Sequence, residues 1–195
     1  MLTAYAGPLR DEPIAIELHN TVYAAGGAVV DGLADPASVR AWLEGLAERL
    51  PDGGDRSRPW PTAQELMALR DPVRVALRAV VTGAAQDAAA LDVINRASAR
   101  APRSPVAAWR PDAHPVAATN YYDAGRADVI IGALASDAID LLTGPRRGDL
   151  RACGAPGCVL MFLKDHPRRE WCSNTCGNRA RQARHYHRAR RQSPA

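Results

Sequence analysis

The chain has 195 residues, of which 47% are hydrophobic and 24% charged, a composition typical of globular domains. No apolar run approaches the ~18 residues that a membrane helix needs, and the opening MLTAYAGPLRDEP lacks the basic and apolar regions of a secretory signal. We therefore expect a cytoplasmic protein with no membrane partner, whose clustered cysteines more often bind metal than pair as disulfides.

The net charge of +4 conceals a segregation of charge along the chain. Residues 1–145 contain 13 arginines and 18 acidic residues, a balance of −5, whereas residues 146–195 contain 12 basic and three acidic residues, a balance of +9. This asymmetry predicts two parts, a domain over residues 1–145 and a basic C-terminal module over residues 146–195. Arg146–Gly148 is the expected hinge between them.

The first predicted elements are a short apolar segment and two helices. In residues 14–23, alternating apolar residues fit a strand, but the segment is equally consistent with the start of a helix. Asp35-Pro36 predicts a helix start, because the apolar residues after it have helical spacing: Val39, Trp42, Leu43, Leu46 and Leu50. After a loop over residues 51–61, the capping box TAQE (62–65) predicts another helix, which Asp71-Pro72 is expected to break or restart.

The rest of the first 145 residues predicts two further helices and a hairpin. Leu91–Arg100 is read as a short helix, and residues 102–122 as two short strands around the turn RPDAHP. A longer helix is expected over Ala124–Leu142, closed by Gly144-Pro145. The predicted fold class is therefore α+β, with a mostly helical N-terminal domain that contains a short β-hairpin.

All four cysteines lie within the C-terminal module, with the spacing C-x4-C-x13-C-x3-C. Two close pairs separated by a hairpin-length spacer predict one structural zinc ion, held in a tetrahedron by Cys153, Cys158, Cys172 and Cys176. An iron–sulfur cluster and redox disulfides are the alternatives. Other possible ligands are His166, His185 and His187, although four cysteines already complete the tetrahedron.

The residues around the cysteines predict a knuckle, a hairpin and a helix. Gly154 and Gly157 allow a tight turn, Val159–Leu163 is strand-like, and Arg169–Cys172 is expected to return antiparallel to it. Ser173 then caps a helix that carries Cys176 in its first turn. This order resembles a treble-clef finger, in which zinc supplies much of the folding free energy because the module has little core of its own.

The helix predicted over residues 174–191 carries six arginines. At 100° per residue, four of them share one stripe ~15 Å long, about the reach of a helix in a DNA major groove: Arg181, Arg184, Arg188 and Arg191. Arg179 and Arg190 project toward the opposite side, so Arg179 is expected to serve the knuckle carbonyls or the zinc-bound sulfurs. The alternative to nucleic-acid binding is a solvated basic surface, or one that meets an acidic protein.

The N-terminal domain is large enough to hold a pocket for a small-molecule effector. His19, Asn20 and Thr21 are polar residues after an apolar run, and Trp42, Trp60 and Trp109 are candidates to line a cavity. The more frequent explanation is that Asn20 and Thr21 satisfy local backbone and that the tryptophans are core. The same domain is also a candidate for homodimerisation, which would let paired fingers read two half-sites.

An enzyme is the least favoured class. Glu17, His19 and His114 are candidate acid–base groups, but no nucleophile motif or phosphate-binding loop accompanies them. A catalytic zinc needs an open coordination position, and four cysteines leave none. We therefore expect no catalytic activity.

Several motifs resemble one protein family. CGNR at residues 176–179, after WCS (171–173) and FLKD (162–165), is similar to the CGNR zinc finger. That finger ends a family of bacterial proteins with an N-terminal ABATE domain, which HNTV (19–22) and LRDPVRVALR (69–78) resemble. The family commonly has four residues between the last two cysteines, and this chain has three.

The resemblance implies a zinc-dependent DNA-binding transcription regulator, with Asn178 and Arg179 of the CGNR motif serving the structure of the finger. The alternative is a zinc-stabilised module that binds protein or RNA without sequence-specific DNA binding.

Overall fold

The structure, a computed structural model, describes residues 4–51, 57–109 and 114–192, apart from the side chains of residues 187, 189, 191 and 192. The helices are α1 (Ile14–His19), α2 (Pro36–Gly45), α3 (Ala63–Thr82), α4 (Ala88–Ser98), α5 (Arg126–Thr143), the 3-10 helix η1 (Pro145–Asp149) and α6 (Asn174–Gln192). The described residues also form antiparallel strand pairs: β1 (Val22–Ala25) with β2 (Ala28–Asp31), β3 (Ser104–Ala108) with β4 (Val116–Asn120), and β5 (Leu150–Ala152) with β6 (Met161–Leu163). The predicted α+β class is confirmed. No described helix has the length and apolar character needed to cross a membrane.

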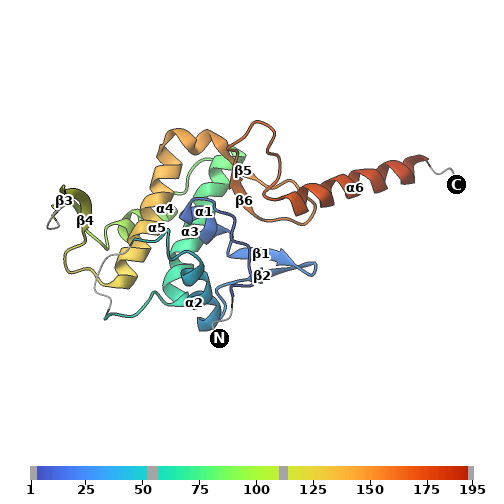
Figure 1. Cartoon of the computed structure of the whole chain (residues 1–195). Helices are drawn as coiled ribbons and strands as arrows, with labels where there is room; N and C mark the ends of the chain where they lie inside the picture. The colour runs from blue at the N-terminus through green and yellow to red at the C-terminus, as the bar shows by residue number, and fades with distance from the viewer. Residues whose placement is uncertain (1–3, 52–56, 110–113, 193–195) are drawn as a thin grey trace.

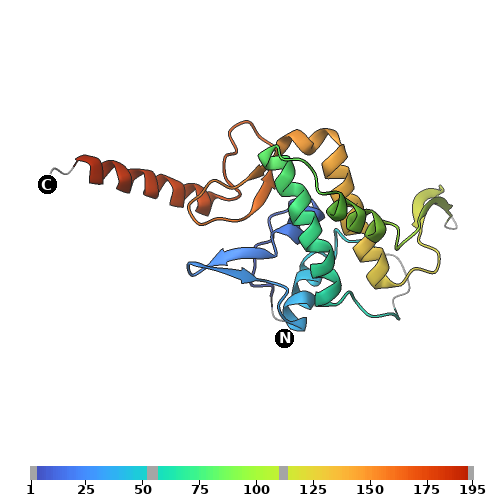
Figure 2. The ribbon, with the colours of Figure 1, turned by 180° about the vertical axis from the view of Figure 1, so that it is seen from behind.

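The main hydrophobic core is built around α3 and α5, with α1, α2 and α4 against them (Figures 1 and 2). The buried side chains of α3 recur at helical spacing and include Leu66, Leu69, Val73, Ala76 and Leu77. Leu150, Met161 and Leu163 of the β5–β6 pair belong to this same core cluster. The C-terminal module is therefore built onto the helical body, while α6 projects away from it and the β3–β4 hairpin lies at the opposite end.

The predicted helix starts of α2 and α3 are confirmed. The Asp35 carboxylate accepts hydrogen bonds from the N–H groups of Ala37 and Ser38, both at 3.0 Å, and Pro36 occupies the first turn. Thr62 and Glu65 form the reciprocal bonds of a capping box. These local signals fix where each helix begins before tertiary packing is considered.

The expected break at Asp71-Pro72 is wrong, because α3 runs without interruption from Ala63 to Thr82. Pro72 lacks the N–H that would bond to the carbonyl of Ala68, which normally destabilises a helix interior. Here the buried stripe continues on both sides of Pro72, with Leu69 2% exposed and Val73 fully buried. Burial of that stripe outweighs the lost hydrogen bond.

The segment over residues 14–23, consistent with either a strand or a helix, is divided between both. Ile14–His19 forms α1, whose Ala15 N–H donates to the Asp137 carboxylate of α5 at 2.8 Å. Ala15, Ile16 and Leu18 are all fully buried, so α1 has no solvent face that would reveal a helical period. Val22 then begins β1.

Sequence reasoning missed the β1–β2 hairpin. Its turn is Gly26-Gly27, with φ angles of 58° and 83° that glycine adopts without strain. Two residues with positive φ make the type of turn that suits a tight hairpin. Gly-Gly between VYAA and AVVD was the available signal.

Two other predictions need smaller changes. The helix expected from Leu91 begins at Ala88, because Asp87 caps it by accepting from the N–H of Ala89 at 2.8 Å. The strands expected in residues 102–122 are confirmed as β3 and β4, and most of their turn, residues 110–113, lies outside the described residues.

The strand expected over Val159–Leu163 forms, but its predicted partner is wrong. β6 pairs with β5, in the register Leu150↔Leu163, and not with Arg169–Cys172. The N–H of Cys153 also donates to the carbonyl of Leu160 at 2.9 Å, so the hairpin closes around the first cysteine pair. Arg169 instead directs its guanidinium to the Leu163 carbonyl and to Glu12, which holds this stretch in a non-strand conformation.

Candidate metal centre and basic helix

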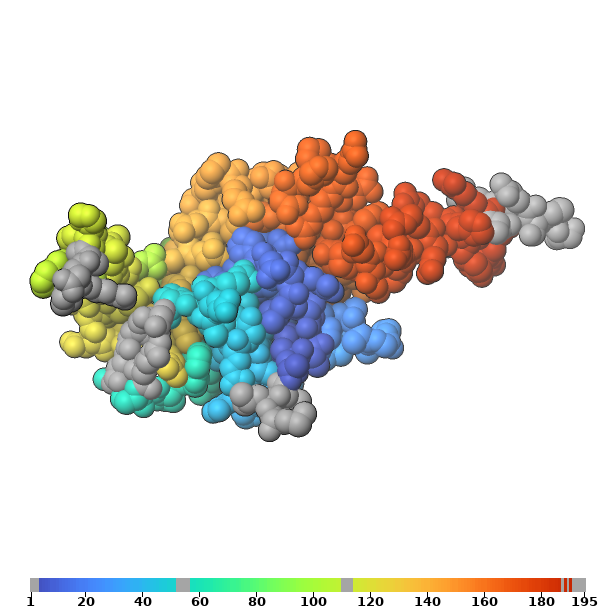
Figure 3. All heavy atoms as spheres, in the orientation of Figure 1, coloured from blue at the N-terminus to red at the C-terminus, as the bar shows by residue number. Residues whose placement is uncertain are grey.

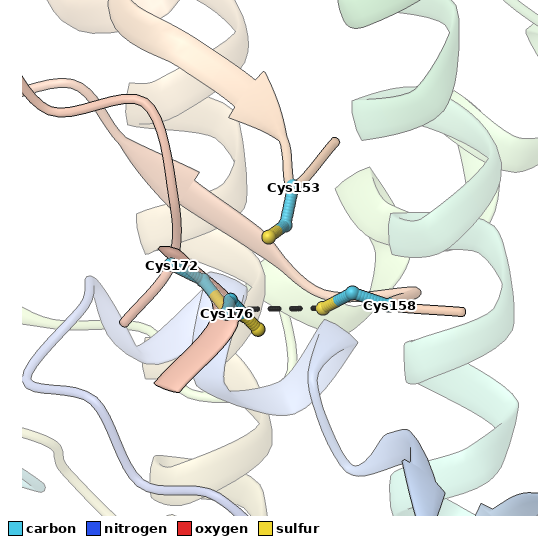
Figure 4. Close-up of side chains that lie close together, drawn as sticks. All are labelled: Cys153, Cys158, Cys172 and Cys176. Carbon is cyan, nitrogen blue, oxygen red and sulfur yellow. Dashed lines mark hydrogen bonds between the residues drawn. The ribbon is translucent and has the colours of Figure 1, made fainter. Parts of the chain in front are cut away.

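The four cysteines come together from the β5–β6 hairpin and the start of α6. Cys153 and Cys158 bracket the knuckle, and Cys172 and Cys176 flank the first turn of α6 (Figure 4). All four sulfurs lie within 4.8 Å of one another. The Sγ–Sγ separations are 3.8 Å for Cys158–Cys172 and 3.5 Å for Cys172–Cys176.

These separations fit a zinc ion. Tetrahedral ligation with Zn–S bonds of ~2.3 Å requires Sγ–Sγ separations of about 3.8 Å. A disulfide requires about 2.05 Å, and all four cysteines are free. The predicted cofactor, one structural zinc ion held by four cysteines, is therefore confirmed. Cys172 and Cys176 are separated by three residues, one fewer than is common in the family, and both still belong to the cluster.

The electrostatics of the cluster favour binding of a cation. Close contact with Cys158 lowers the pKa of Cys153, and the resulting thiolate raises the pKa of Cys158 to about 11 and that of Cys172 as well. Four neighbouring thiols cannot all ionise together without a compensating positive charge. A divalent ion supplies that charge and is bound as the protons leave.

A small hydrophobic cluster encloses the cysteines. It contains Cys153, Ala155, Leu160, Phe162, Cys172, Cys176 and Ala180, with Tyr23 and Trp171 packed against it. Gly177 of the CGNR motif is required by close packing, since a Cβ atom there would lie 2.9 Å from the Trp171 ring. Ser173 Oγ accepts from the N–H of Cys176 at 3.2 Å and caps α6 as predicted.

The two polar residues of the CGNR motif make different contacts. The Arg179 guanidinium donates to Cys176 Sγ at 3.3 Å, so it faces the cysteine cluster. Asn178 Oδ1 accepts from Arg181 Nη2 at 2.6 Å and orients the first arginine of the predicted stripe. A guanidinium at the sulfur offsets part of the −2 formal charge that a Cys₄ zinc site carries.

The histidines proposed as alternative ligands do not join the metal group among the described residues. His166 Nδ1 accepts from the N–H of Arg168 at 3.1 Å, and His185 is exposed on α6. The side chain of His187 lies outside the described residues.

The basic helix stands clear of the body (Figure 3). The side chains of Arg181, Arg184 and Arg188 are exposed, as the stripe prediction requires, and the side chain of Arg191 lies outside the described residues. Arg190 is also exposed, and its guanidinium lies 5.7 Å from the centre of the Tyr186 ring. Residues 174–192 contain no acidic residue.

Of the candidate pocket residues, Asn20 joins the two parts of the chain. Asn20 Nδ2 donates to the Met161 carbonyl at 3.0 Å, and the Met161 N–H donates to Asn20 Oδ1 at 2.9 Å. Thr21 Oγ1 donates to the Leu18 carbonyl at 2.8 Å. His19, Asn20 and Thr21 are at most 1% exposed, so all three are buried within the fold.

Glu12 makes the second connection, and sequence reasoning missed it. Its carboxylate accepts from the N–H of Leu163 at 2.9 Å and pairs with Arg169, while the residue is only 3% exposed. The two partners are 151 and 157 positions away in sequence, so no local pattern could have indicated either contact.

The candidate acid–base residues do not form one site. Glu17 Oε1 accepts from the N–H groups of Arg10 and Glu12 at 2.8 and 2.9 Å, and burial raises its pKa. Burial, aided by Arg74, lowers the pKa of His19 to about 3. His114 is exposed beside β4, at the other end of the molecule from α6 (Figure 1).

The three tryptophans proposed to line a cavity occupy three different environments. Trp42 is fully buried in the core, and Trp109 is 70% exposed. Trp60 lines a hollow of about 400 Å³ between α2 and the start of α3. The Arg126 guanidinium lies 4.3 Å from the centre of the Trp60 ring. The three therefore do not line a common cavity.

Comparison with known families matches most of the chain to two family models. Residues 12–145 match ABATE, described as "Putative stress-induced transcription regulator", and residues 150–189 match the CGNR zinc finger. Both resemblances drawn from the motifs are confirmed, and neither description names an enzyme. Among curated proteins, none matches the sequence.

Proposed function

The chain belongs to the ABATE family and contains a CGNR zinc finger, and we propose that it is a zinc-dependent, DNA-binding transcription regulator. In this proposal α6 binds duplex DNA, and the zinc ion holds the N-terminal turn of α6 in place. Residues 1–145 act as the regulatory domain, through dimerisation or a small-molecule effector. The protein acts on the chromosome in the cytoplasm and catalyses no reaction.

The observation that carries the proposal is the exposed, projecting α6. It has six arginines and no acidic residue, so it presents a single sign of charge. Like charges three and four positions apart, such as Arg184 with Arg181 and Arg188, destabilise an isolated helix. A polyanion removes that repulsion, and a helix of this diameter fits the DNA major groove.

The zinc site gives this helix a fixed direction. Cys172 and Cys176 anchor its first turn, and Ala180 is the last described residue of α6 in the hydrophobic cluster. The stripe at Arg181, Arg184 and Arg188 begins directly after this anchored turn. The cluster therefore supports a role in which metal binding positions the arginines toward the nucleic acid.

The test is a salt-titrated mobility shift with duplex DNA, using the zinc-loaded full chain. We expect binding to weaken steeply with salt, and the double substitution Arg184→Ala with Arg188→Ala to weaken it strongly. The matched control is Arg96→Ala with Arg103→Ala, which removes the same charge from exposed positions outside the C-terminal module.

Two outcomes would contradict the proposal. One is a zinc-loaded protein that does not bind duplex DNA at low salt. The other is a stronger response to single-stranded RNA or to an acidic protein in parallel titrations, which would favour the interaction-module alternative.

Of the two forms proposed for the role of residues 1–145, the small-molecule form has a supporting observation in the structure. The 400 Å³ hollow beside Trp60 is of a size that accepts a small ligand. A dimer would place two basic helices on two half-sites of one duplex. Sedimentation of the full chain with and without DNA would test the dimer form.

A further inference from the structure

A second basic surface lies across the start of α6. It is a groove of about 820 Å³ whose lining includes Arg10, Arg168, Arg181 and Arg184. These arginines come from three separate segments: the chain before α1, the turn after β6, and α6 itself. The groove therefore continues the stripe of α6 onto residues that helical periodicity could not identify.

The four guanidinium groups keep their positive charge available at the surface. All four residues are exposed, and none forms an ion pair with another described residue. Arg181 donates to the Asn178 amide, a neutral acceptor that leaves its charge in place. Arg169 also lines the groove but is paired with Glu12 and Asp165, and Glu170 is the acidic residue of the lining.

Buried carboxylates hold the outlying arginines beside α6. Glu17 accepts from the backbone N–H of Arg10 at 2.8 Å, which fixes the backbone there without engaging the guanidinium. Glu12 bonds to β6 through Leu163 and pairs with Arg169, the neighbour of Arg168. The groove is thus built by the same junction that joins the two parts of the chain.

We propose that this groove binds the phosphodiester backbone of the duplex DNA whose major groove receives α6. The inference rests on the proposed function and extends it, because it gives Arg10 of the N-terminal part a direct DNA contact. Arginine binds phosphate through paired N–H donors, and phosphate contacts fix the orientation of a reading helix. Arg10 and Arg168 are positioning contacts, independent of base sequence.

The experiment compares Arg10→Ala, Arg168→Ala and their double variant with the Arg96→Ala control, by salt-titrated binding of the zinc-loaded full chain. Removing one arginine–phosphate interaction should reduce the slope of log K against log salt by ~0.9, equivalent to roughly 8-fold weaker binding at 0.1 M salt. The double variant should show about twice that reduction in slope. Glu170→Gln should change the affinity in the opposite direction, because it removes the acidic residue of the groove.

The outcomes separate this inference from the function on which it rests. If the wild type binds and Arg184→Ala with Arg188→Ala weakens binding, but Arg10→Ala and Arg168→Ala match the control, the groove is not a DNA contact and the helix assignment stands. A loss of affinity for single-stranded RNA alone would also overturn the groove assignment. A wild type that ignores DNA overturns both. Zinc content and far-ultraviolet circular dichroism of each variant check that it is folded.

Discussion

At the scale of single residues, Asn20 is the side chain that most directly holds the C-terminal module to the helical body. Its amide satisfies both the N–H and the carbonyl of Met161, and it is fully buried. Asn20→Ala leaves two buried backbone groups unpaired, each at a cost of about 1–3 kcal/mol. We expect the free energy of unfolding to fall by roughly 2–5 kcal/mol in urea titrations, whereas exposed Asn95→Ala changes it by less than about 0.5 kcal/mol.

His19 should make the stability of the protein depend on pH. Its pKa is about 3 in the folded chain, against ~6.5 when unfolded. Between these values only the unfolded chain takes up the proton, so stability falls as the pH drops from 6.5 toward 3.

Between pH 7 and pH 5 this single group should remove about 2 kcal/mol. Urea titrations of the wild type and His19→Asn, in excess zinc, measure the effect. Equal losses in the two proteins would show that other groups account for the dependence.

Arg179 should raise the affinity for zinc. Its guanidinium lies 3.3 Å from Cys176 Sγ, and loss of such a partner typically costs 10–100-fold in metal affinity. We expect that decrease for Arg179→Ala in competition with a chromophoric chelator. Arg188→Ala removes the same charge from the same helix and should leave zinc affinity unchanged.

The metal site could be predicted from the sequence, whereas the junction could not. The spacing of the four cysteines predicts a shared metal site, because local turns are enough to bring each pair of ligands together. Glu12 meets Leu163, and Asn20 meets Met161, only once the N-terminal segment and β6 pack on the same core. Each of these residues looks ordinary within its own segment. For Asn20 and Thr21, the more frequent explanation, that they satisfy backbone groups, describes the geometry.

At the scale of elements, the errors arose where tertiary packing overrides a local signal. α1 was ambiguous because it is buried on all sides, and α3 continues through Pro72 because its apolar stripe does. The partner of β6 was misassigned because the knuckle between Cys153 and Cys158 acts as the hairpin turn. Capping residues predicted the starts of α2 and α3 correctly, because a helix cap depends only on residues within one turn.

A substitution at Pro72 measures how much stability α3 loses by keeping a proline in its interior. Pro72→Ala restores an N–H to the interior of α3 and removes the ring, while the unfolded chain gains some freedom. We expect the free energy of unfolding to rise by about 1–2 kcal/mol. Pro36→Ala, at the first turn of α2 where no N–H partner exists, should give no gain.

At the scale of the whole molecule, zinc should stabilise more than the module that binds it. Leu150, Met161 and Leu163 are shared with the main core, so loss of the metal loosens β5 and β6 where they contact α1 and α3. If metal binding contributes about 5 kcal/mol or more, removing it should lower Tm by roughly 10–20 °C.

Calorimetry of the full chain before and after chelation tests this, and Cys172→Ser should reproduce the metal-free profile. Unchanged melting of the helical core after zinc removal would show that the two parts unfold independently.

The shared core also limits how the C-terminal module can be transferred to another protein. A fragment that begins at residue 146 would expose Leu150, Met161 and Leu163 and would lose the bonds from Asn20 and Glu12. Grafting the arginine helix onto another scaffold therefore requires a host surface that can accept three apolar side chains and bond to one strand. Substitutions in α6 are free of this constraint from Arg181 onward, whereas those in β5 must be matched by changes in α3 and those in β6 by changes in α1.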